Sequence, residues 1–358
     1  MTLLTNNSLG RRRPEPYREG VSERLGFPFP VVIGHRGACG YRPEHSAAAY
    51  LLAFELGADF VEPDVVVTRD GQLVIRHENE ISGTTDVAGH PEFAVRRTTK
   101  VVDGIEREGW FTEDFTWAEL STLRCTERMP ELRPQSAEFD GQFGILRLAD
   151  LFALIDEATD ASRRPLGMVA ELKHPTYFAG LGFSLAELFA AEVRGADWDG
   201  SQDRLVVESF EPTCLAELRW SGIQCTNVLL VEAEGAPADL VASLGELALP
   251  YASFITHEGL QRLAGDSTVD GISVPKDMLV ERGGAEFVEE AHRARLAVFA
   301  WTLRPENEFL AQPFRVGADA AQFGDWAGEF SAILGTGVDG VFADHPDLAV
   351  AARSALER

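Results

Sequence analysis

Residues 59–67 read DFVEPDVVV, an apolar and β-branched run that carries two acidic side chains in its middle. A short run of this composition is typical of a buried strand in a parallel sheet. Seven further runs have the same character: VVIGH (31–35), GMVAEL (167–172), RLVVESF (204–210), TNVLLV (226–231), VDGISV (269–274), LAVFAWTL (296–303) and VDGVFAD (338–344). Eight parallel strands are the number that closes a (β/α)8 barrel.

Amphipathic segments separate these runs. Apolar residues recur at helical spacing in SAAAYLLAFELG (46–57), LADLFALIDEATD (148–160) and SLAELFAAEVRG (184–195), and several segments end at Gly, a helix stop signal. Strands that alternate with helices predict an α/β protein, here a (β/α)8 TIM barrel. A chain of 358 residues suits one barrel domain with insertions. We expect that domain over residues 29–352, after an N-terminal tail over residues 1–28.

Two stretches depart from the alternation. TRDGQLVIRH (68–77) has an Asp-Gly turn between apolar residues, which predicts a short hairpin. Residues 78–146 show no barrel element and are too long for a structureless loop, so we expect an inserted subdomain there. Its aromatic residues either form its own small core, which we favour, or belong to a lid that faces the substrate; they are Phe93, Trp110, Phe111, Phe115 and Trp117.

The charge and cysteine content exclude several classes of protein. A formal net charge of −25 disfavours DNA, RNA and anionic membrane surfaces as partners, because those contacts need a basic face. No apolar stretch is long enough to span a bilayer, and the Arg11–Arg13 segment is followed by no apolar region of a signal peptide. The four cysteines form no Cys-x-x-Cys pair, which predicts buried thiols in a reducing cytoplasm; they are Cys39, Cys125, Cys214 and Cys225.

Glu62 and Asp64 form the densest cluster of chemistry. A spacing of two along a strand places both carboxylates on one face, with Pro63 on the other. Two desolvated acids at that distance need a cation or a shared proton. One interpretation is a buried salt bridge to an Arg or Lys of the barrel. A hard divalent ion, Ca²⁺ or Mg²⁺, fits carboxylate oxygens better.

Glu171 and Lys173 repeat this spacing in AELKH (170–174). Glu171 is expected to supply a third carboxylate ligand, and Lys173 to offset the negative charge and hold a phosphate oxygen. The alternative is an ion pair between the two residues. We consider it weak, because residues at i and i+2 point alike without being close partners.

His35 and His77 each stand at the end of a predicted strand, which in a barrel is the catalytic end. Imidazoles exchange protons near neutral pH, so one histidine can accept a proton from a nucleophile while the other protonates a leaving alkoxide. Cleavage of a phosphodiester needs both transfers. Arg36, between His35 and Gly37, is either a donor to phosphate oxygens or part of a structural ion pair.

At these residues the sequence resembles the glycerophosphodiester phosphodiesterase family, from about Val31 to Ala349. The family pattern His-Arg-Gly followed by Pro-Glu-Asn-Thr/Ser is similar to residues 35–37 and 43–46, and its Glu-x-Asp-Val, Thr-x-Asp-Gly and later His match residues 62–65, 68–71 and His77. Further similarity lies at residues 171–173, 209–210, 301–302 and 339–342. Each match is short, but their order agrees with the predicted strand ends.

The resemblance implies a barrel of the phospholipase C-like phosphodiesterase type with an insertion after the second strand. It implies hydrolysis of glycerophosphodiesters to sn-glycerol 3-phosphate and an alcohol, a step in glycerol and lipid metabolism. The implied roles are metal binding by Glu62, Asp64 and Glu171; acid and base chemistry by His35 and His77; substrate or phosphate contact by Arg36, Lys173 and Trp301; and support of the site by Glu44.

His45 departs from the family, which more often has Asn there. His is a poorer helix N-cap than Asn, so we expect Ser46 to cap the first helix instead and a contact to Glu44 to differ.

Two rival functions remain. One is a phospholipase of the same fold, of the sphingomyelinase D or phosphoinositide type, and the other is a barrel that binds phosphodiesters without cleaving them. The sequence leaves open the head group, the native metal, which histidine is the base, whether a cyclic phosphate forms, and whether the chain is a homo-oligomer.

Overall fold

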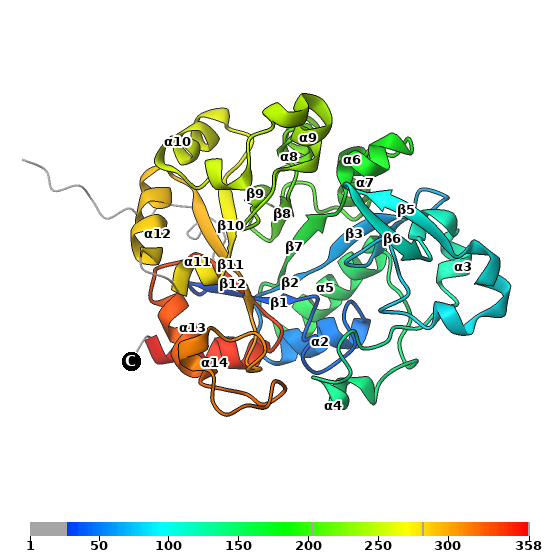
Figure 1. The fold of residues 1–358 in the computed structure, drawn as a ribbon, viewed down its shortest axis with the longest axis horizontal. Helices are drawn as coiled ribbons and strands as arrows, with labels where there is room; N and C mark the ends of the chain where they lie inside the picture. Colours follow the sequence, from blue (N-terminus) through cyan, green and yellow to red (C-terminus); the bar gives the residue numbers. More distant parts are fainter. Residues whose placement is uncertain (1–26, 202, 281–282, 357–358) are drawn as a thin grey trace, which may run out of the picture.

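Eight parallel strands close a barrel in the computed structural model, which describes residues 27–201, 203–280 and 283–356 (Figure 1). They are β1 (Val31–His35), β2 (Phe60–Glu62) continued by β3 (Asp64–Val67), β7 (Gly167–Leu172), β8 (Leu205–Ser209), β9 (Thr226–Leu230), β10 (Gly271–Pro275), β11 (Ala297–Leu303) and β12 (Gly340–Ala343). β1 pairs with β2 and β12, and β7 pairs with both β2 and β3, so the ring has no free edge. The predicted (β/α)8 barrel is confirmed.

Alternate residues of these strands fill the barrel interior. The interior cluster consists of Val31, Ile33, Phe60, Val169, Val206, Val228, Ala297, Phe299 and Phe342. Because side chains alternate along a strand, the next inward position beyond each member lies two residues further on. Taken from the last member on each strand, that step leads to His35, Glu62, Glu171, Glu208, Leu230, Trp301 and Asp344. The packing that fills the barrel therefore also aims these side chains at its carboxyl-terminal mouth.

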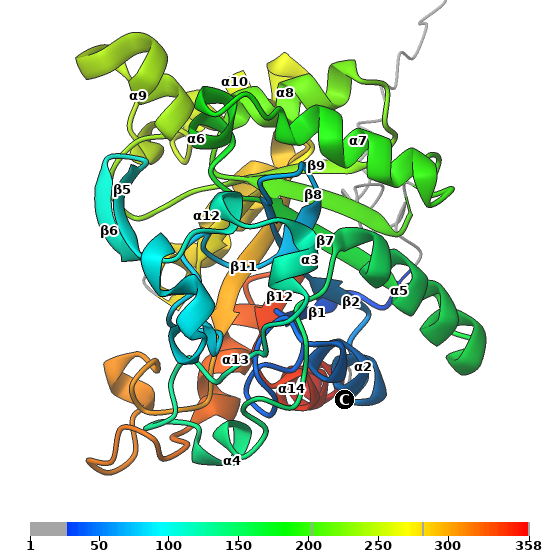
Figure 2. The ribbon, with the colours of Figure 1, turned by 90° about the vertical axis from the view of Figure 1, so that its right-hand side faces the viewer.

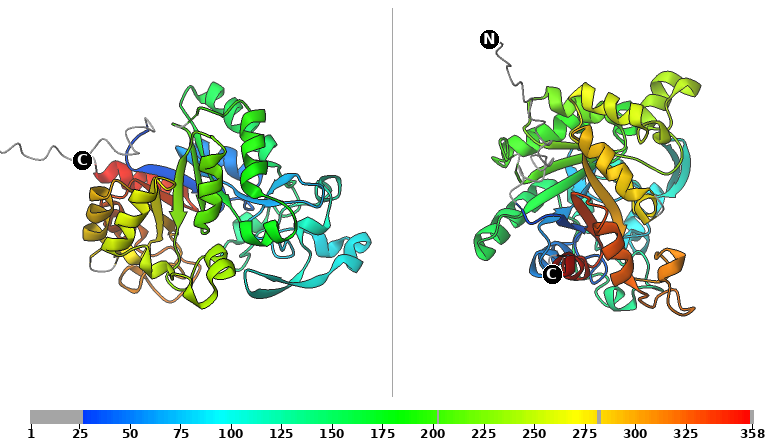
Figure 3. Two further views of the ribbon diagram at one scale, coloured as in Figure 1. Left: turned by 90° about the horizontal axis from the view of Figure 1, so that it is seen from above. Right: turned by 90° about the vertical axis from the view of Figure 1, so that its left-hand side faces the viewer.

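Helices surround the barrel on its outside (Figures 1 and 3). The outer layer contains α2 (Ala47–Glu55), α5 (Leu148–Ser162), α7 (Leu185–Gly195), α8 (Pro212–Trp220), α10 (His257–Asp266), α12 (Gly284–Arg293), α13 (Trp326–Leu334) and α14 (Pro346–Leu356). Ser46 caps α2 by accepting a hydrogen bond from the Ala49 amide at 3.2 Å, as predicted. Three short helices lie near the mouth or beside it: α6 (Pro175–Gly180), α9 (Ala238–Leu244) and α11 (Asp277–Val280).

The insertion lies to one side of the barrel and follows the predicted hairpin, in which β4 (Leu73–Ile75) pairs antiparallel with β3 (Figures 2 and 3). It contains the antiparallel pair β5 (Thr98–Val102) and β6 (Ile105–Gly109) and the short helices α3 (Trp117–Leu120) and α4 (Pro134–Ala137). Four of its predicted core aromatics are buried: Phe93, Trp110, Phe111 and Phe115. This core is continuous with the layer between barrel and helices, so it is not a separate one.

The remaining predictions concern the cysteines, membrane spans and the tail. All four cysteines are buried and free, as expected. Among the described residues, no helix is both long and apolar enough to cross a membrane. The predicted tail falls outside the described residues except for its last two positions. Of these, Phe27 packs on Phe60 with ring centroids 4.5 Å apart.

Candidate active site

The mouth of the barrel holds a cavity of about 880 Å³. Among its lining residues are most of the predicted site residues: His35, Arg36, Glu62, His77, Glu171, Lys173 and Trp301. A second cavity of about 220 Å³ is also lined by His35, Arg36 and His77, and by Glu44. The two histidines therefore stand where both cavities reach, although 42 residues separate them along the chain.

The three predicted metal ligands lie together. One carboxylate oxygen from each of Glu62, Asp64 and Glu171 falls within 4.8 Å of the other two. Glu62 and Asp64 come from adjoining strands β2 and β3, and Glu171 is the register partner of Asp64 on β7. The backbone amide of Arg36 donates to Glu62 Oε2 at 2.8 Å, which fixes that carboxylate from the β1 side.

Lys173 and Arg36 supply the positive charge beside these acids. Lys173 Nζ lies 2.8 Å from Glu171 Oε1 and 3.7 Å from Asp64 Oδ1. The expectation that Glu171 and Lys173 would not be close partners was wrong. The lysine side chain has four methylene groups and bends back along the face that the two residues share. Arg36 pairs with Glu44 at 3.1 Å and approaches Asp64 at 3.5 Å, so its predicted ion pair is present.

The unpaired oxygens of the cluster fit a cation. Glu62 Oε1 and Asp64 Oδ1 are buried without a hydrogen-bond partner among the described residues. Burial and the nearby Asp64 raise the pKa of Glu62 well above its ordinary value. Burial also raises the pKa of Glu171 to about 8, although Lys173 acts in the opposite direction. A divalent ion would satisfy these oxygens and keep the acids ionised, and an all-carboxylate set suits Ca²⁺ or Mg²⁺.

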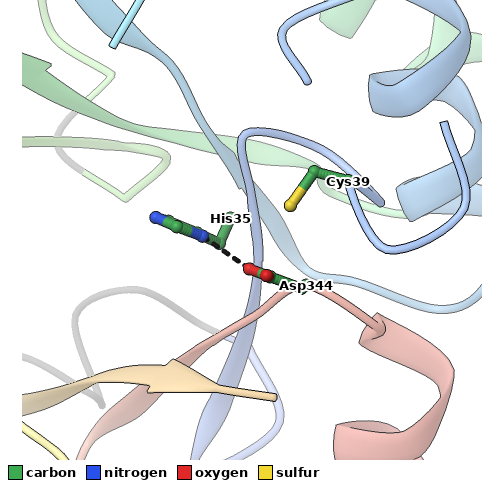
Figure 4. Close-up of side chains that lie close together, drawn as sticks. All are labelled: His35, Cys39 and Asp344. Atoms are coloured by element: carbon green, nitrogen blue, oxygen red, sulfur yellow. Dashed lines mark hydrogen bonds and ion pairs between the residues drawn. The ribbon is translucent and has the colours of Figure 1, made fainter. Parts of the chain in front are cut away.

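His35 is positioned by a carboxylate at the end of β12 (Figure 4). Its Nδ1 lies 2.6 Å from Asp344 Oδ1, which leaves Nε2 for a reacting group. Asp344 also accepts from Arg133 Nη2 at 2.6 Å and from Arg304 Nε at 2.8 Å. Burial disfavours the Asp344 charge, but Arg304 and Arg133 hold the pKa of this carboxyl well below its ordinary value. Burial and Arg36 lower the pKa of His35 to about 4.

His77 has a similar partner, but one that belongs to the insertion. Its Nδ1 lies 2.6 Å from Glu78 Oε1. Arg128 donates two hydrogen bonds to Glu78, at 3.0 and 2.7 Å, and two to Glu44, both at 2.7 Å. Burial, with Arg36 and Lys173, lowers the pKa of His77 to about 3. Both histidines are thus neutral at pH 7 and can accept a proton at Nε2.

His45 contacts the cluster of Glu62, Asp64 and Glu171, and not Glu44. Its Nε2 lies 2.9 Å from Asp64 Oδ2 and its Nδ1 lies 2.7 Å from the Tyr50 hydroxyl. The residue is fully buried and has a positive φ of 59°. The departure from the family pattern therefore places an imidazole directly behind one carboxylate of the cluster.

Several residues of the site were not predicted. Asp344, Glu78 and Arg128 hold the histidines, and Glu208 is a fourth acid, the register partner of Glu171, with its Oε2 buried and unpartnered. Glu208 interrupts the apolar run RLVVESF at an inward position, so the signal that identified Glu62 applies to it as well. Glu78 directly follows His77, whereas no local pattern marks the partnership of Asp344 or Arg128.

Cys39 lies beside His35 and Asp344 without a hydrogen bond to either (Figure 4). Burial and Asp344 raise the pKa of its thiol well above the ordinary value. A protonated thiol is a poor metal ligand, and Asp344 is already bound by two arginines and His35. This group therefore does not suit a metal.

The polar side chains above lie at the carboxyl ends of the strands, where barrel enzymes carry their active sites, and this defines the class of the protein as a TIM-barrel enzyme. The chain belongs to the glycerophosphoryl diester phosphodiesterase family, which matches residues 35–348.

Known relatives agree with this assignment. The chain is 29% identical to glycerophosphodiester phosphodiesterase GDPD6 of Arabidopsis thaliana, over 96% of this chain and 92% of that protein. Similarity to the glycerophosphodiester phosphodiesterases of Haemophilus influenzae (26% identical) and Treponema pallidum (28% identical) covers 51% of this chain and 50% and 51% of those proteins. Among solved structures, a glycerophosphoryl diester phosphodiesterase from Silicibacter pomeroyi has a TM-score of 0.64 at 21% identity, covering 94% of this chain and 98% of that one. A phosphodiesterase from Oleispira antarctica has a TM-score of 0.57 at 20% identity, covering 91% and 97%. Both share the fold.

Proposed function

We propose that the protein hydrolyses glycerophosphodiesters to sn-glycerol 3-phosphate and an alcohol, with a divalent cation held by Glu62, Asp64 and Glu171. The observation that carries this proposal is the cluster of three buried carboxylates with unpaired oxygens, adjacent to two neutral imidazoles on one cavity. Family membership supports the reaction. The Oleispira antarctica phosphodiesterase, whose structure holds sn-glycerol-3-phosphate as product, supports the substrate class.

When bound there, a divalent cation offsets the phosphate charge and lowers the pKa of a coordinated hydroxyl. Arg36 and Lys173 add positive charge next to the cluster, where they can hold phosphate oxygens and orient the phosphorus for in-line attack. Glu44 binds both Arg36 and Arg128, and so holds the Arg36 guanidinium beside Asp64.

The two histidines move the protons. One Nε2 accepts the proton of the attacking hydroxyl. The other histidine must take up a proton from solvent at Nε2 when the anionic phosphodiester binds beside it, and it then donates this proton to the departing alkoxide. Because each Nδ1 faces a carboxylate, the imidazolium that forms is stabilised in place. If the adjacent glycerol hydroxyl is the nucleophile, a cyclic phosphate forms and water opens it with the histidine roles reversed. If water attacks directly, no cyclic phosphate forms, and trapping it from the wild-type enzyme distinguishes the two routes.

Release of glycerol 3-phosphate, measured with and without EDTA, tests the proposal. Wild type with Ca²⁺ or Mg²⁺ should be active, and EDTA should abolish the activity. His35→Ala and Glu62→Gln should each lower kcat by about 10²–10⁴. Absence of product from every glycerophosphodiester would instead favour a barrel that only binds such compounds, and activity confined to lipid vesicles would favour a phospholipase.

A further inference from the structure

The outer part of the main cavity extends beyond the catalytic residues. A volume of about 880 Å³ lies within the ~300–1,000 Å³ of sites that enclose drug-sized ligands. A glycerol phosphate at Glu62, Glu171 and the histidines fills only the inner end. The outer end is formed by the tip of the β5–β6 hairpin, the loops after β8 and β9, and α9, elements that gather on one side of the mouth (Figure 2).

Carboxylates dominate the charge of this outer part. Asp103 comes from the hairpin tip, Glu211 from the loop after β8, and Glu232 and Glu234 from the loop after β9. Burial raises the pKa of the Tyr251 hydroxyl, and Glu232, Glu211, Asp239 and Asp103 add to the rise, so negative charge lies near this phenol. Glu232 and Glu234 are exposed and have no ion-pair partner among the described residues.

The cations on the same walls do not neutralise these acids. Arg304 is bound to Asp344, and Lys276 to the buried Glu329. His174 is hydrogen-bonded to Asp103. Among the described residues that line the cavity, Arg107 on β6 is the one cation without an acid partner. Burial raises the pKa of Glu211 to about 8, so this carboxyl is largely protonated at pH 7. Glu232 and Glu234, with Asp103 beside His174, therefore outnumber the single unpaired guanidinium on these walls.

Aromatic side chains form the wall between the acids and the catalytic residues. The ring of Phe210 lies 6.1 Å from that of Trp301 and 6.1 Å from that of Tyr251, nearly perpendicular to both. Lys173 lies over the Phe210 ring, with its Nζ 5.7 Å from the ring centroid. Aromatic faces beside carboxylates attract organic cations.

A buried carboxylate between the catalytic residues and the aromatic wall is also without a partner in the described part of the chain. Glu208 lies on β8, two residues before Phe210, which follows the strand. It is 2% exposed, lines the cavity and has no partner for Oε2. Trp301 Nε1, on the aromatic wall, also has no acceptor among the described residues.

We propose that the outer part of the cavity binds the leaving alcohol, and that it selects an alcohol carrying a positively charged amine, such as a trimethylammonium or ammonium group. The inference rests on the proposed function, because it places the glycerol phosphate at the inner end. A substrate in this orientation puts its phosphate beside Arg36 and Lys173 and its amine between Tyr251, Trp301 and the acidic loop after β9. A neutral alcohol gains nothing from these charges, and an anionic one is repelled by them.

The test compares kcat/KM for glycerophosphocholine and glycerophosphoglycerol, which share the glycerol phosphate and differ in the charge of the alcohol. Wild type should favour the choline diester by tenfold or more. The double variant E232Q/E234Q should lower this ratio on the order of fivefold, and the effect should shrink as salt is raised. R107Q removes the opposing charge and should increase the ratio. E286Q, an exposed acid on α12 outside the cavity, should leave the ratio unchanged.

Choline chloride supplies a readout of binding alone. It should inhibit hydrolysis of glycerophosphoglycerol competitively, and more weakly in E232Q/E234Q, whereas added glycerol should inhibit neither protein at the same concentration. A wild-type ratio near one, or a ratio that E232Q/E234Q leaves unchanged, overturns the inference while leaving the proposed function intact. If neither diester is hydrolysed, both are overturned.

Discussion

His35 and His77 have equivalent surroundings built from different parts of the chain. Each imidazole binds a carboxylate through Nδ1 at 2.6 Å, and each carboxylate binds arginine. Asp344, the partner of His35, is 1% exposed and is held by Arg133 and Arg304. Glu78, the partner of His77, is 18% exposed and depends on Arg128, which is itself 28% exposed.

The difference lies in how firmly each partner is held. Asp344 follows a barrel strand and shares Arg133 with Glu306, which is also buried, so this side of the site is part of the folded core. Glu78 begins the insertion, and Arg128 joins it to Glu44 near the surface. Salt bridges that are screened by solvent contribute less than buried ones that must remain paired. The His35 side should therefore be more sensitive to loss of its carboxylate than the His77 side.

Asp344→Asn is expected to have the largest effect. Asparagine can present its amide to His35 Nδ1, which favours the wrong tautomer, and it leaves two arginines without their shared charge. We expect kcat/KM to fall on the order of 10²–10⁴-fold and the free energy of unfolding to fall by about 3 kcal/mol. Glycerol 3-phosphate release and denaturant unfolding measure the two effects.

The control for Asp344→Asn is Asp347→Asn, which alters a half-buried acid on α14 that binds the Tyr41 hydroxyl instead of a histidine. It should keep wild-type kcat/KM within about twofold. If Asp344→Asn retained more than a tenth of the activity, Asp344 would be a structural partner of the arginines and not a positioning residue for His35.

Glu78→Gln tests the weaker side and should lower kcat/KM about tenfold. Glutamine can still accept from Arg128, but it holds an imidazolium less well than a carboxylate does. Arg128→Met should have a similar effect, and the double variant should lose little more, because the two residues act as one unit on His77. Arg97→Met, which removes an exposed arginine of the insertion paired with Glu108, is the matched control. Additive losses would contradict the proposed unit.

The sequence predicted the part of the site on the barrel strands, around His35, much better than the part around His77 that depends on the insertion. Strand runs and their alternation are local properties, so they predicted the barrel, the shared face of Glu62 and Asp64, and the strand-end positions of Glu171, His35 and Trp301. The same alternation marks Glu208. The Asp344 partner lies 309 residues from His35 and becomes a neighbour only when β12 pairs with β1 at closure of the ring. No sequence periodicity predicts the contact between His35 and Asp344.

The insertion was harder to predict because its segments are short and irregular. Its aromatic residues indicated a core, but nothing in residues 78–146 indicated that Arg128 turns inward to Glu44, or that the β5–β6 hairpin tip lines the cavity. The pairing of Lys173 with Glu171 was misjudged for a related reason. Backbone spacing predicts the direction of Cβ, whereas the position of the terminal group of a long side chain depends on the charges around it.

Acid pH should weaken the fold through both histidines. The pKa of His35 is about 4 in the folded protein and that of His77 about 3, below the ~6.5 of an unfolded chain. Between pH 6.5 and about 4 the unfolded imidazoles bind protons that the folded ones do not, so the stabilisation due to the two histidines is complete above pH 6.5 and is lost as pH drops through this window. The raised pKa values of Glu171 and Glu211, each about 8, act in the opposite direction, so the histidine contribution is the difference in slope between wild type and the histidine variants. The slope should reach about 1.4 kcal/mol per pH unit for each histidine.

Urea unfolding in EDTA at several pH values measures this slope. His35→Asn should reduce the slope by more than His77→Asn does, because the His35 side chain is 12% exposed and is therefore less screened by solvent than that of His77, which is 28% exposed. An equal or larger reduction in His77→Asn would show that the insertion shields its histidine as well as the barrel does, which would remove the contrast between the two sides.

His45→Asn should have the smallest effect. It tests whether the carboxylate cluster on the barrel strands tolerates at position 45 the residue that is more common in the family. Asn adopts a positive φ readily and can keep one hydrogen bond to Asp64, but it is too short to contact Tyr50 as well. We expect the apparent affinity for the activating cation to change by about threefold, the size of one modest hydrogen bond. His45→Leu, which leaves Asp64 without that donor, should weaken the affinity by about 10–100-fold. Titration of activity and of direct cation binding separates this effect from loss of folding. Equal affinity in both variants would mean that Arg36 and Lys173 alone orient Asp64, and that His45 merely fills the space behind it.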